Sequence, residues 1–247
     1  MNVPAVKVDE LHARLGFKSP IDYPATSMHK PLHQWRMEID DAPIFRYLYR
    51  NFRPKRHLEF GTWQGMGARY CLEECDATVW TINLPFGEVL PSGKYAYKYY
   101  DREREEVRRW ADRIGWPIDH VERTDGIGFV GRCYLEKNLG HRVCQIYCNS
   151  MHWDHSAYPN GFFDSVLIDG GHLPEVVASD THMALGLLRQ GGLILWHDFC
   201  PTLEVRKLCA SPEGVVEAIR QNWDSLRSQT RDLFWIQPSW ILAGIRA

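Results

Sequence analysis

Short apolar runs alternate with helical patterns along most of this 247-residue chain. Five runs rich in β-branched and aromatic residues predict strands. They cover residues 57–60, 78–82, 143–147, 163–168 and 193–196. Apolar residues that recur every three to four positions predict helices at 41–53, 67–72 and 174–189. This alternation favours an α/β fold with a Rossmann-like, doubly wound and mostly parallel sheet.

The C-terminal part of the chain predicts a hairpin that closes the sheet. A helix at 214–223 precedes two apolar strands at 233–236 and 240–243. The connection between the strands, Gln237-Pro238-Ser239, is too short for a crossover. We therefore expect these two strands to be antiparallel.

The boundaries of the predicted domain follow from turn and cap signals. Residues 1–40 have few periodic apolar positions and are expected to form an N-terminal extension with at most short helices, so 41–247 is expected to form a single domain. Asp41-Ala42-Pro43 supplies an N-cap and an early proline for the first helix of that domain. Gly191-Gly192 is expected to stop the helix before the fifth strand.

The segment 84–141 is longer than one crossover connection requires. Its dense mixed charges at 101–110 suit a solvated helix. The aromatic run at 94–100 is expected to form a lid or an interface between copies, which makes a homo-oligomer possible, or to pack beneath the charged helix.

Composition narrows the classes of partner. The formal net charge of −2 gives no sign of the basic field that nucleic acid or an anionic membrane would attract. The N-terminus lacks the body of a secretory signal, and no uncharged apolar stretch reaches the ~20 residues that span a bilayer. Seven cysteines without a C-x-x-C pair favour reduced thiols. We expect a soluble cytoplasmic protein that binds neither nucleic acid nor membranes.

Polar residues follow all five predicted strands of the main sheet, where open α/β sheets bind ligands. They are Glu59 to Gly65, Asn83, Asn149-Ser150, Asp169 to His172, and His197-Asp198. Gly61 and Gly65 would let the backbone turn tightly and approach a ligand. Glu59 can accept hydrogen bonds or balance a cation, which suits a sulfonium with an amino-acid tail better than a pyrophosphate.

The loop Glu59-Phe60-Gly61-Thr62-Trp63-Gln64-Gly65 resembles the E-x-G-x-x-x-G loop of class I S-adenosylmethionine-dependent methyltransferases. The blocks at 163–172 and 187–199 are similar to small bacterial O-methyltransferases, including ones that act on sugars, and to the catechol O-methyltransferase layout. The likeness covers roughly residues 55–200.

The resemblance implies S-adenosylmethionine as cofactor and a set of residues that bind it. These residues are Glu59, Gly61, Thr62, Trp63, Gly65, Asn83, Asn149, Ser150 and Asp169. Glu59, Gly61 and Gly65 would line the methionine part, and Asn149 and Ser150 would lie near adenine. Asn83 stands where the family usually bonds the ribose through a carboxylate, and an amide can also bond a diol.

Methyl transfer to a hydroxyl needs that hydroxyl to be activated by a base or a metal ion. Asp169 ends one strand and His197-Asp198 ends the next, about 4.8 Å away in a sheet, so these side chains can converge on one ion. Catechol-type enzymes hold magnesium at this spacing, which implies Asp169, His197 and Asp198 as ligands of Mg²⁺ or Mn²⁺. A nitrogen ligand weakens the case for magnesium and leaves manganese, zinc or no metal open.

His172 occupies the position of the basic residue in the catechol enzymes, which implies a general base, with Asp169 as the second catalytic residue. The plain alternatives are that Asp169 and Asp198 cap helices or loop amides, that His197 is a core histidine, and that His172 is merely solvated.

These residues predict an O-methyltransferase that acts on a hydroxyl of a small acceptor, with a sugar, polysaccharide or glycoside as the favoured class. A phenol or catechol acceptor is the first alternative. A short-chain NAD(P)-dependent dehydrogenase is another, because Gly61, Gly65 and Gly67 also suit a dinucleotide loop, although no Tyr-x-x-x-Lys pair is present. A non-catalytic binding protein of the same fold is the third.

Overall fold

The computed structural model describes residues 1–19, 21, 31–35, 37–84, 109, 113, 130–209 and 213–247. Its eight strands form one sheet in the order β1-β7-β8-β6-β5-β2-β3-β4. The strands are β1 (Ala5–Lys7), β2 (Arg56–Phe60), β3 (Thr78–Asn83), β4 (Val143–Tyr147), β5 (Phe163–Ile168), β6 (Leu188–Trp196), β7 (Thr230–Gln237) and β8 (Leu242–Arg246). Among them, β8 alone is antiparallel to its neighbours, β6 and β7. The predicted doubly wound sheet with a C-terminal antiparallel hairpin is confirmed.

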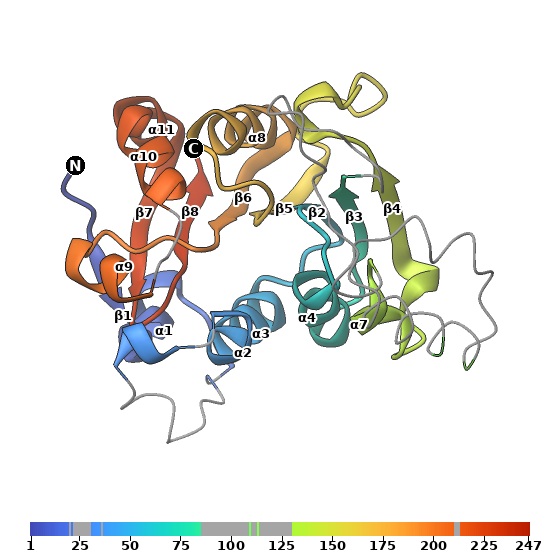
Figure 1. The fold of residues 1–247 in the computed structure, drawn as a ribbon, viewed down its shortest axis with the longest axis horizontal. Helices are drawn as coiled ribbons and strands as arrows, with labels where there is room; N and C mark the ends of the chain where they lie inside the picture. The colour runs from blue at the N-terminus through green and yellow to red at the C-terminus, as the bar shows by residue number, and fades with distance from the viewer. Residues whose placement is uncertain are drawn as a thin grey trace.

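Helices cover both faces of the sheet (Figure 1). The described helices are α1 (Leu11–Leu15), α2 (Met37–Asp40), α3 (Ala42–Phe52), α4 (Met66–Glu74), α7 (Arg132–Leu135), α8 (Pro174–Leu187), α9 (Leu203–Cys209), α10 (Glu213–Gln221) and α11 (Trp223–Gln229), with short 3₁₀ turns η1 (Val8–Glu10), η2 (Leu32–Gln34), η3 (Gly140–Arg142) and η4 (Ser150–His152). In Figure 1, α8, α10 and α11 lie on one side of the strands and α2, α3 and α4 on the other. The core therefore forms two layers, one on each face of the sheet.

The register of the central strands brings their carboxyl ends level. Phe60 of β2 pairs with Ile82 of β3 and with Ile168 of β5, and Ile168 pairs with Trp196 of β6. The next residue of each strand or loop, including Gly61 and the residues after β5 and β6, therefore leaves the sheet at one edge. This register positions the predicted ligand residues side by side.

Asp164 fixes this register from the opposite edge of the sheet. Its carboxylate accepts hydrogen bonds from the backbone N–H groups of Lys55 and Arg56, at 2.9 and 2.8 Å, and from Nε of Arg189 at 2.8 Å. These contacts join the starts of β2, β5 and β6. The arginine holds the pKa of Asp164 below its usual range despite the opposing effect of burial.

Two local expectations were wrong. The N-terminal extension contains more than short helices, because β1 pairs in parallel with β7 and extends the sheet. Gly191-Gly192 does not stop α8, which ends at Leu187 and passes directly into β6, so the two glycines lie inside that strand. Leu187 and Leu188 are both buried, so the change from helix to strand takes place inside the core.

Most of the elaborated 84–141 segment lies outside the described residues. The aromatic run at 94–100 is entirely outside them, and of the charged stretch 101–110 only residue 109 is described. The expectation of a lid or a copy-to-copy interface there remains a prediction, as does the division into an extension and a single domain.

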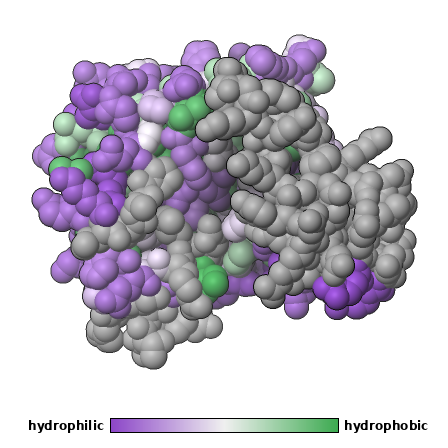
Figure 2. Space-filling model, in the orientation of Figure 1, coloured by the Kyte–Doolittle hydropathy of each residue, from purple (hydrophilic) through white to green (hydrophobic). Residues whose placement is uncertain are grey.

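Over the described surface that faces the viewer in Figure 2, most residues are hydrophilic, with a few separate apolar patches. Within the described ranges, none of the helices has the length and apolar character that a membrane crossing requires.

Candidate functional site

The glycine loop after β2 lies directly against the end of β5. Gly61 has a φ of +96°, and a Cβ there would collide with the backbone of Asp169 and Gly170. The N–H of Asp169 donates to the carbonyl of Phe60 at 2.8 Å, and the N–H of Gly61 donates to that of Ile82 at 2.9 Å. Only glycine permits both the positive φ and this close approach. The loop is therefore held between β3 and β5.

Glu59 ends a buried chain of hydrogen bonds that crosses three strands. The hydroxyl of Thr81 donates to Glu59 at 2.5 Å and lies 2.7 Å from the hydroxyl of Thr62. Nε2 of Gln145 donates to Thr62 at 2.9 Å, and the Tyr134 hydroxyl donates to Oε1 of Gln145, also at 2.9 Å. Because Thr81 uses its proton on Glu59, Thr62 must donate to Thr81. All donors in the chain thus point toward the carboxylate of Glu59.

Glu59 belongs to β2, and its buried carboxylate lies next to the first turn of α4. Burial raises its pKa to about 8, the hydrogen bond from Thr81 lowers it, the charge of Asp169 raises it, and the backbone N–H of Ala68 lowers it. Gly67 of α4 would collide with the Glu59 carboxylate if it carried a Cβ. A ligand with positive charge near Glu59 would favour its ionised form.

Asn83 and Asn149 are engaged with nearby backbone. Oδ1 of Asn83 accepts a 2.9 Å hydrogen bond from the N–H of Trp63, and Nδ2 donates to the carbonyl of Leu84 at 3.0 Å. Oδ1 of Asn149 accepts from the N–H of Met151 at 3.1 Å. These contacts shape the loops, and the predicted roles of both residues toward the ribose and adenine stay predictions.

Asp169, His172 and Asp198 form a cluster at the carboxyl ends of β5 and β6. Each offers a ligand atom within 4.8 Å of the others, and this is the group that fits a metal ion among the described residues. Nε2 of His172 lies 2.7 Å from Oδ2 of Asp198. The side chain of His172 is 45 % exposed and that of Asp198 is 9 % exposed, so the pair joins a buried carboxylate to an accessible ring. Asp198 has a φ of +56°, an uncommon conformation for a residue with a side chain.

His197 lies behind this cluster, between two carboxylates. Its Nδ1 is 3.0 Å from Oδ1 of Asp169, and its Nε2 is 3.2 Å from Oδ2 of Asp41. The N–H of Trp240 also donates to both oxygens of Asp41, at 3.3 Å. Both ring nitrogens of His197 are therefore occupied, and the carboxylate of Asp41 does not cap α3 as predicted but turns toward β6 and the hairpin.

The charges of this group follow from burial and pairing. Burial lowers the pKa of His197, but the charges of Asp169 and Asp198 and the hydrogen bonds to Asp169 and Asp41 raise it well above its ordinary value. Burial raises the pKa of Asp41 to about 6, against the opposing effect of His197. The hydrogen bond to Asp198 raises the pKa of His172, with burial opposing. The two neighbouring carboxylates therefore favour the protonated form of His197.

The loop and the cluster line a single cavity with a volume of about 590 Å³. All predicted cofactor residues except Gly65 line it, as do the predicted catalytic and metal residues. Gly65 is instead the N-cap residue of α4, with a φ of +79°. The tertiary structure thus gathers the predicted residues in one place, while their individual roles stay predictions.

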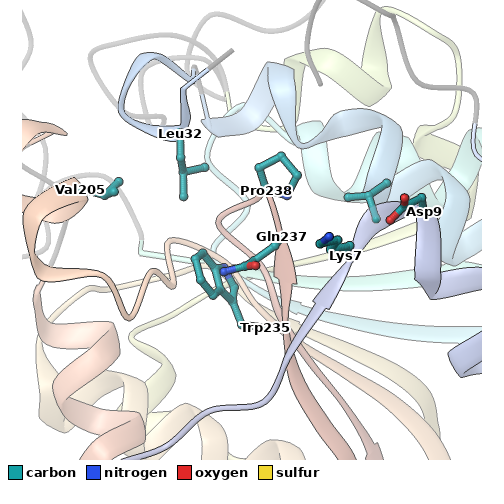
Figure 3. Close-up of a pocket in the computed structure, with 8 residues that line it drawn as sticks. Lys7, Asp9, Leu32, Val205, Trp235, Gln237 and Pro238 are labelled. Atoms are coloured by element: carbon teal, nitrogen blue, oxygen red, sulfur yellow. The ribbon is translucent and has the colours of Figure 1, made fainter. Parts of the chain in front are cut away.

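A second cavity, of about 400 Å³, lies at the ends of β1 and β7 (Figure 3). Trp235 and Pro238 from the hairpin, Leu32 from η2 and Val205 from α9 give it an apolar lining, with Lys7 at one side. No described residue lines both cavities. It is separate from the site at the ends of β2, β5 and β6.

Comparison with known proteins identifies the family. The sequence model of a methyltransferase domain matches residues 58–199, more than half of the chain. The chain belongs to this methyltransferase family. The match begins in β2 and ends just after Asp198, so it covers both the glycine loop and the acidic cluster. The predicted methyltransferase is confirmed, and the dehydrogenase alternative is set aside.

Solved structures support the fold. A methyltransferase from Podospora anserina, PaMTH1, bound to SAH, is 13% identical with a TM-score of 0.52, over 92% of this chain and 83% of that one. The O-methyltransferase TomG from Streptomyces achromogenes, in complex with SAM, is 15% identical with a TM-score of 0.50, over 97% of this chain and 96% of that one. None of the curated proteins compared with this sequence matches it. The methyltransferase keeps the Rossmann-like fold at low identity.

The sequence reasoning missed two acidic residues of the site. Asp41 matched a helix N-cap pattern, so its pairing with His197 was hidden. Asp180 lies four residues after Val176 and four before Ala184, so it falls on the apolar face of α8. A lone acid on an apolar face was the available signal for Asp180.

Proposed function

We propose that this methyltransferase transfers a methyl group from S-adenosylmethionine to a hydroxyl of a small acceptor, with a sugar or other saccharide as the preferred class. One observation carries the proposal: the glycine loop and the Asp169–His172–Asp198 cluster line the same cavity. The glycine loop suits a sulfonium cofactor, and the Asp169–His172–Asp198 cluster suits the activation of a hydroxyl. The SAM and SAH complexes of the two neighbours support the same cofactor.

The cofactor would lie along the loop and the ends of β3 and β4. Its sulfonium supplies an electrophilic methyl group. Gly61 allows the backbone to approach the methionine part, and Glu59 provides a carboxylate close to its positive charges. Asn83 is our candidate for the ribose hydroxyls, and Ser150 for the adenine side.

His172 and Asp198 form the base of the proposed reaction. With Nε2 donating to Asp198, the neutral ring keeps an unprotonated Nδ1, which accepts the proton of the acceptor hydroxyl. The resulting imidazolium is stabilised by the carboxylate 2.7 Å away. Asp198 also fixes the orientation of the ring. This pairing follows the logic of a histidine base oriented by an acid.

The same cluster fits a divalent cation. Its two carboxylate oxygens, from Asp169 and Asp198, suit Mg²⁺ or Mn²⁺, and the nearby imidazole of His172 favours Mn²⁺ over Mg²⁺ if it enters the coordination shell in place of acting as the base. Because both nitrogens of His197 are occupied and His172 serves as the base, we propose the carboxylates of Asp169 and Asp198 as the protein ligands of such a cation, in place of a set that includes His197. A bound cation would lower the pKa of a coordinated hydroxyl.

Two acceptor classes have support. The saccharide class rests on the Asp-Gly-Gly-His and Trp-His-Asp blocks that resemble sugar methyltransferases. A phenolic acceptor is the second candidate, because the rings of Phe45 and Tyr70 line the same cavity, stacked with centroids 6.3 Å apart. An aromatic wall of this kind suits a planar acceptor as well as a sugar face.

The test measures transfer of a labelled methyl group to panels of saccharides and phenols, using the wild type, His172→Ala and the matched control His182→Ala, an exposed histidine of α8. We expect His172→Ala to lose about 10²- to 10⁴-fold in rate while His182→Ala keeps its rate. Full activity of His172→Ala would disprove the base. Cofactor binding without transfer to any hydroxyl would favour a non-catalytic binding protein.

A further inference from the structure

Asp180 is a buried acid in the site cavity that the proposed reaction does not use. It lies in α8, is 1 % exposed, and lines the same cavity as the glycine loop. Neither carboxylate oxygen has a hydrogen-bond partner of good geometry among the residues that the structure describes. Burial raises its pKa to about 7, and a weaker hydrogen-bond interaction with the side chain of Ser150 lowers it.

A buried carboxyl without a partner weakens a fold, because it loses its hydration and gains no hydrogen bond in return. Two other buried acids have hydrogen-bond partners: Asp41 is bonded to His197 and Trp240, and Glu59 to Thr81. Asp180 is therefore a candidate to accept a hydrogen bond from a bound ligand.

The residues that line the cavity near Asp180 indicate what kind of ligand would fit there. Leu173, Val176 and Asp180 are spaced three and four residues apart, so one face of α8 lines the cavity. Exposure falls along this face from 59 % at Leu173 to 1 % at Asp180. Ser150 of η4 lines the cavity from the end of β4. An apolar wall that leads to an acid suits a flat ring with a donor on its inner edge.

S-adenosylmethionine carries three kinds of hydrogen-bond donor: the ammonium group, the ribose hydroxyls and the 6-amino group of adenine. Glu59 and Asn83, at the ends of β2 and β3, suit the first two. Asp180 lies beyond them, against the turn that follows β4, where only the base can reach if the cofactor runs along the sheet edge. The flat, apolar ring of the base also fits the wall formed by Leu173 and Val176.

We propose that Asp180 accepts a hydrogen bond from the 6-amino group of the cofactor's purine and so selects 6-aminopurine over 6-oxopurine cofactors. This inference rests on the proposed use of S-adenosylmethionine. A 6-oxo group would put an acceptor oxygen against a carboxylate, which repels it.

The test compares two ligands by calorimetry: S-adenosylhomocysteine and its 6-oxo analogue, S-inosylhomocysteine. At a pH well above 7, where Asp180 is ionised, the wild type should prefer the 6-amino ligand by about tenfold or more, as one hydrogen bond to a charged acceptor implies. In Asp180→Asn the amide can present its N–H₂ to a 6-oxo group, so the ratio of the two affinities should fall toward one. Glu175→Gln, an exposed acid of the same helix, should leave the ratio unchanged.

Stability separates this role from a structural one. Without ligand, Asp180→Asn should melt at the wild-type temperature or above it, because the substitution removes an unpartnered buried acid. An unchanged ligand ratio in Asp180→Asn, or an equal loss for both ligands with a lower melting temperature, would overturn the proposal. If the wild type bound neither ligand, the proposed cofactor itself would be wrong, which is a different result.

Discussion

Replacing Asp41 by alanine should destabilise the protein strongly. Asp41 is completely buried and accepts hydrogen bonds from Nε2 of His197 at 3.2 Å and from the N–H of Trp240 at 3.3 Å. The alanine variant leaves a buried imidazolium with Asp169 as its remaining direct partner and leaves a buried N–H unsatisfied. Removing one partner of a buried ion pair costs about 3–5 kcal/mol.

For a domain of this size, each kcal/mol lowers the melting temperature by about 2–4 °C. The loss at Asp41→Ala therefore corresponds to roughly 6–20 °C. Asp41→Asn keeps an acceptor oxygen of similar size but removes the charge, so its loss should be smaller. Together the two variants separate the hydrogen bonds from the charge.

The measurement is urea unfolding followed by circular dichroism, with calorimetric melting as a second probe. The matched control is Glu217→Ala, which breaks an exposed pair with Arg220 on α10 and should change the unfolding midpoint little. An Asp41→Ala variant that unfolds at the wild-type urea concentration would refute the reasoning, because the contacts between Asp41, His197 and Trp240 would then contribute nothing.

Three further predictions concern the site. Gly61→Ala should lose cofactor binding, as measured by calorimetry. The alanine would have to adopt a positive φ, which costs about 1–3 kcal/mol, and its Cβ would collide with the backbone of Asp169. A wild-type affinity in this variant would contradict the loop geometry. Because Asp198 raises the pKa of His172 above 6.5, the rate of the wild type should fall as the pH drops through that raised pKa. In Asp198→Asn this fall in rate on the acidic side should move to lower pH, and kcat should decrease. A pH profile with the same acidic midpoint would show that Asp198 does not act on His172. Treatment with EDTA should lower the rate and Mn²⁺ should restore it, whereas a rate unchanged by chelation would show that His172 acts without a metal ion.

The fold and the cofactor loop could be predicted because their signals are local. β2, β3, β4 and β5 each lie within a residue or two of the predicted strand, since a run of β-branched and aromatic residues reports a buried strand directly. The glycines at 61 and 65 both adopt positive φ, as the spacing of the loop suggested. The short strand β1 was not predicted, because three residues are too few to show the alternation of apolar and polar positions that indicates a strand.

The partners within the site could not be predicted, because they depend on contacts between distant parts of the chain. The sequence favoured Asp41 as a helix cap and His197 as a metal ligand, yet 156 positions separate these two residues and their side chains meet in the core. Because two carboxylates occupy both ring nitrogens of His197, it is His172 that forms the cluster with Asp169 and Asp198.

The amino-acid sequence by itself determined the alternating α/β fold, the methyltransferase loop and the set of polar residues at the strand ends, because backbone preference and hydrophobic period act over a few residues. Only the tertiary structure decided which of those side chains pair, which are buried, and that Asp180 faces the cavity without a partner. Burial and pairing set the charge of each acid and histidine, and both arise when the sheet brings remote segments to one edge.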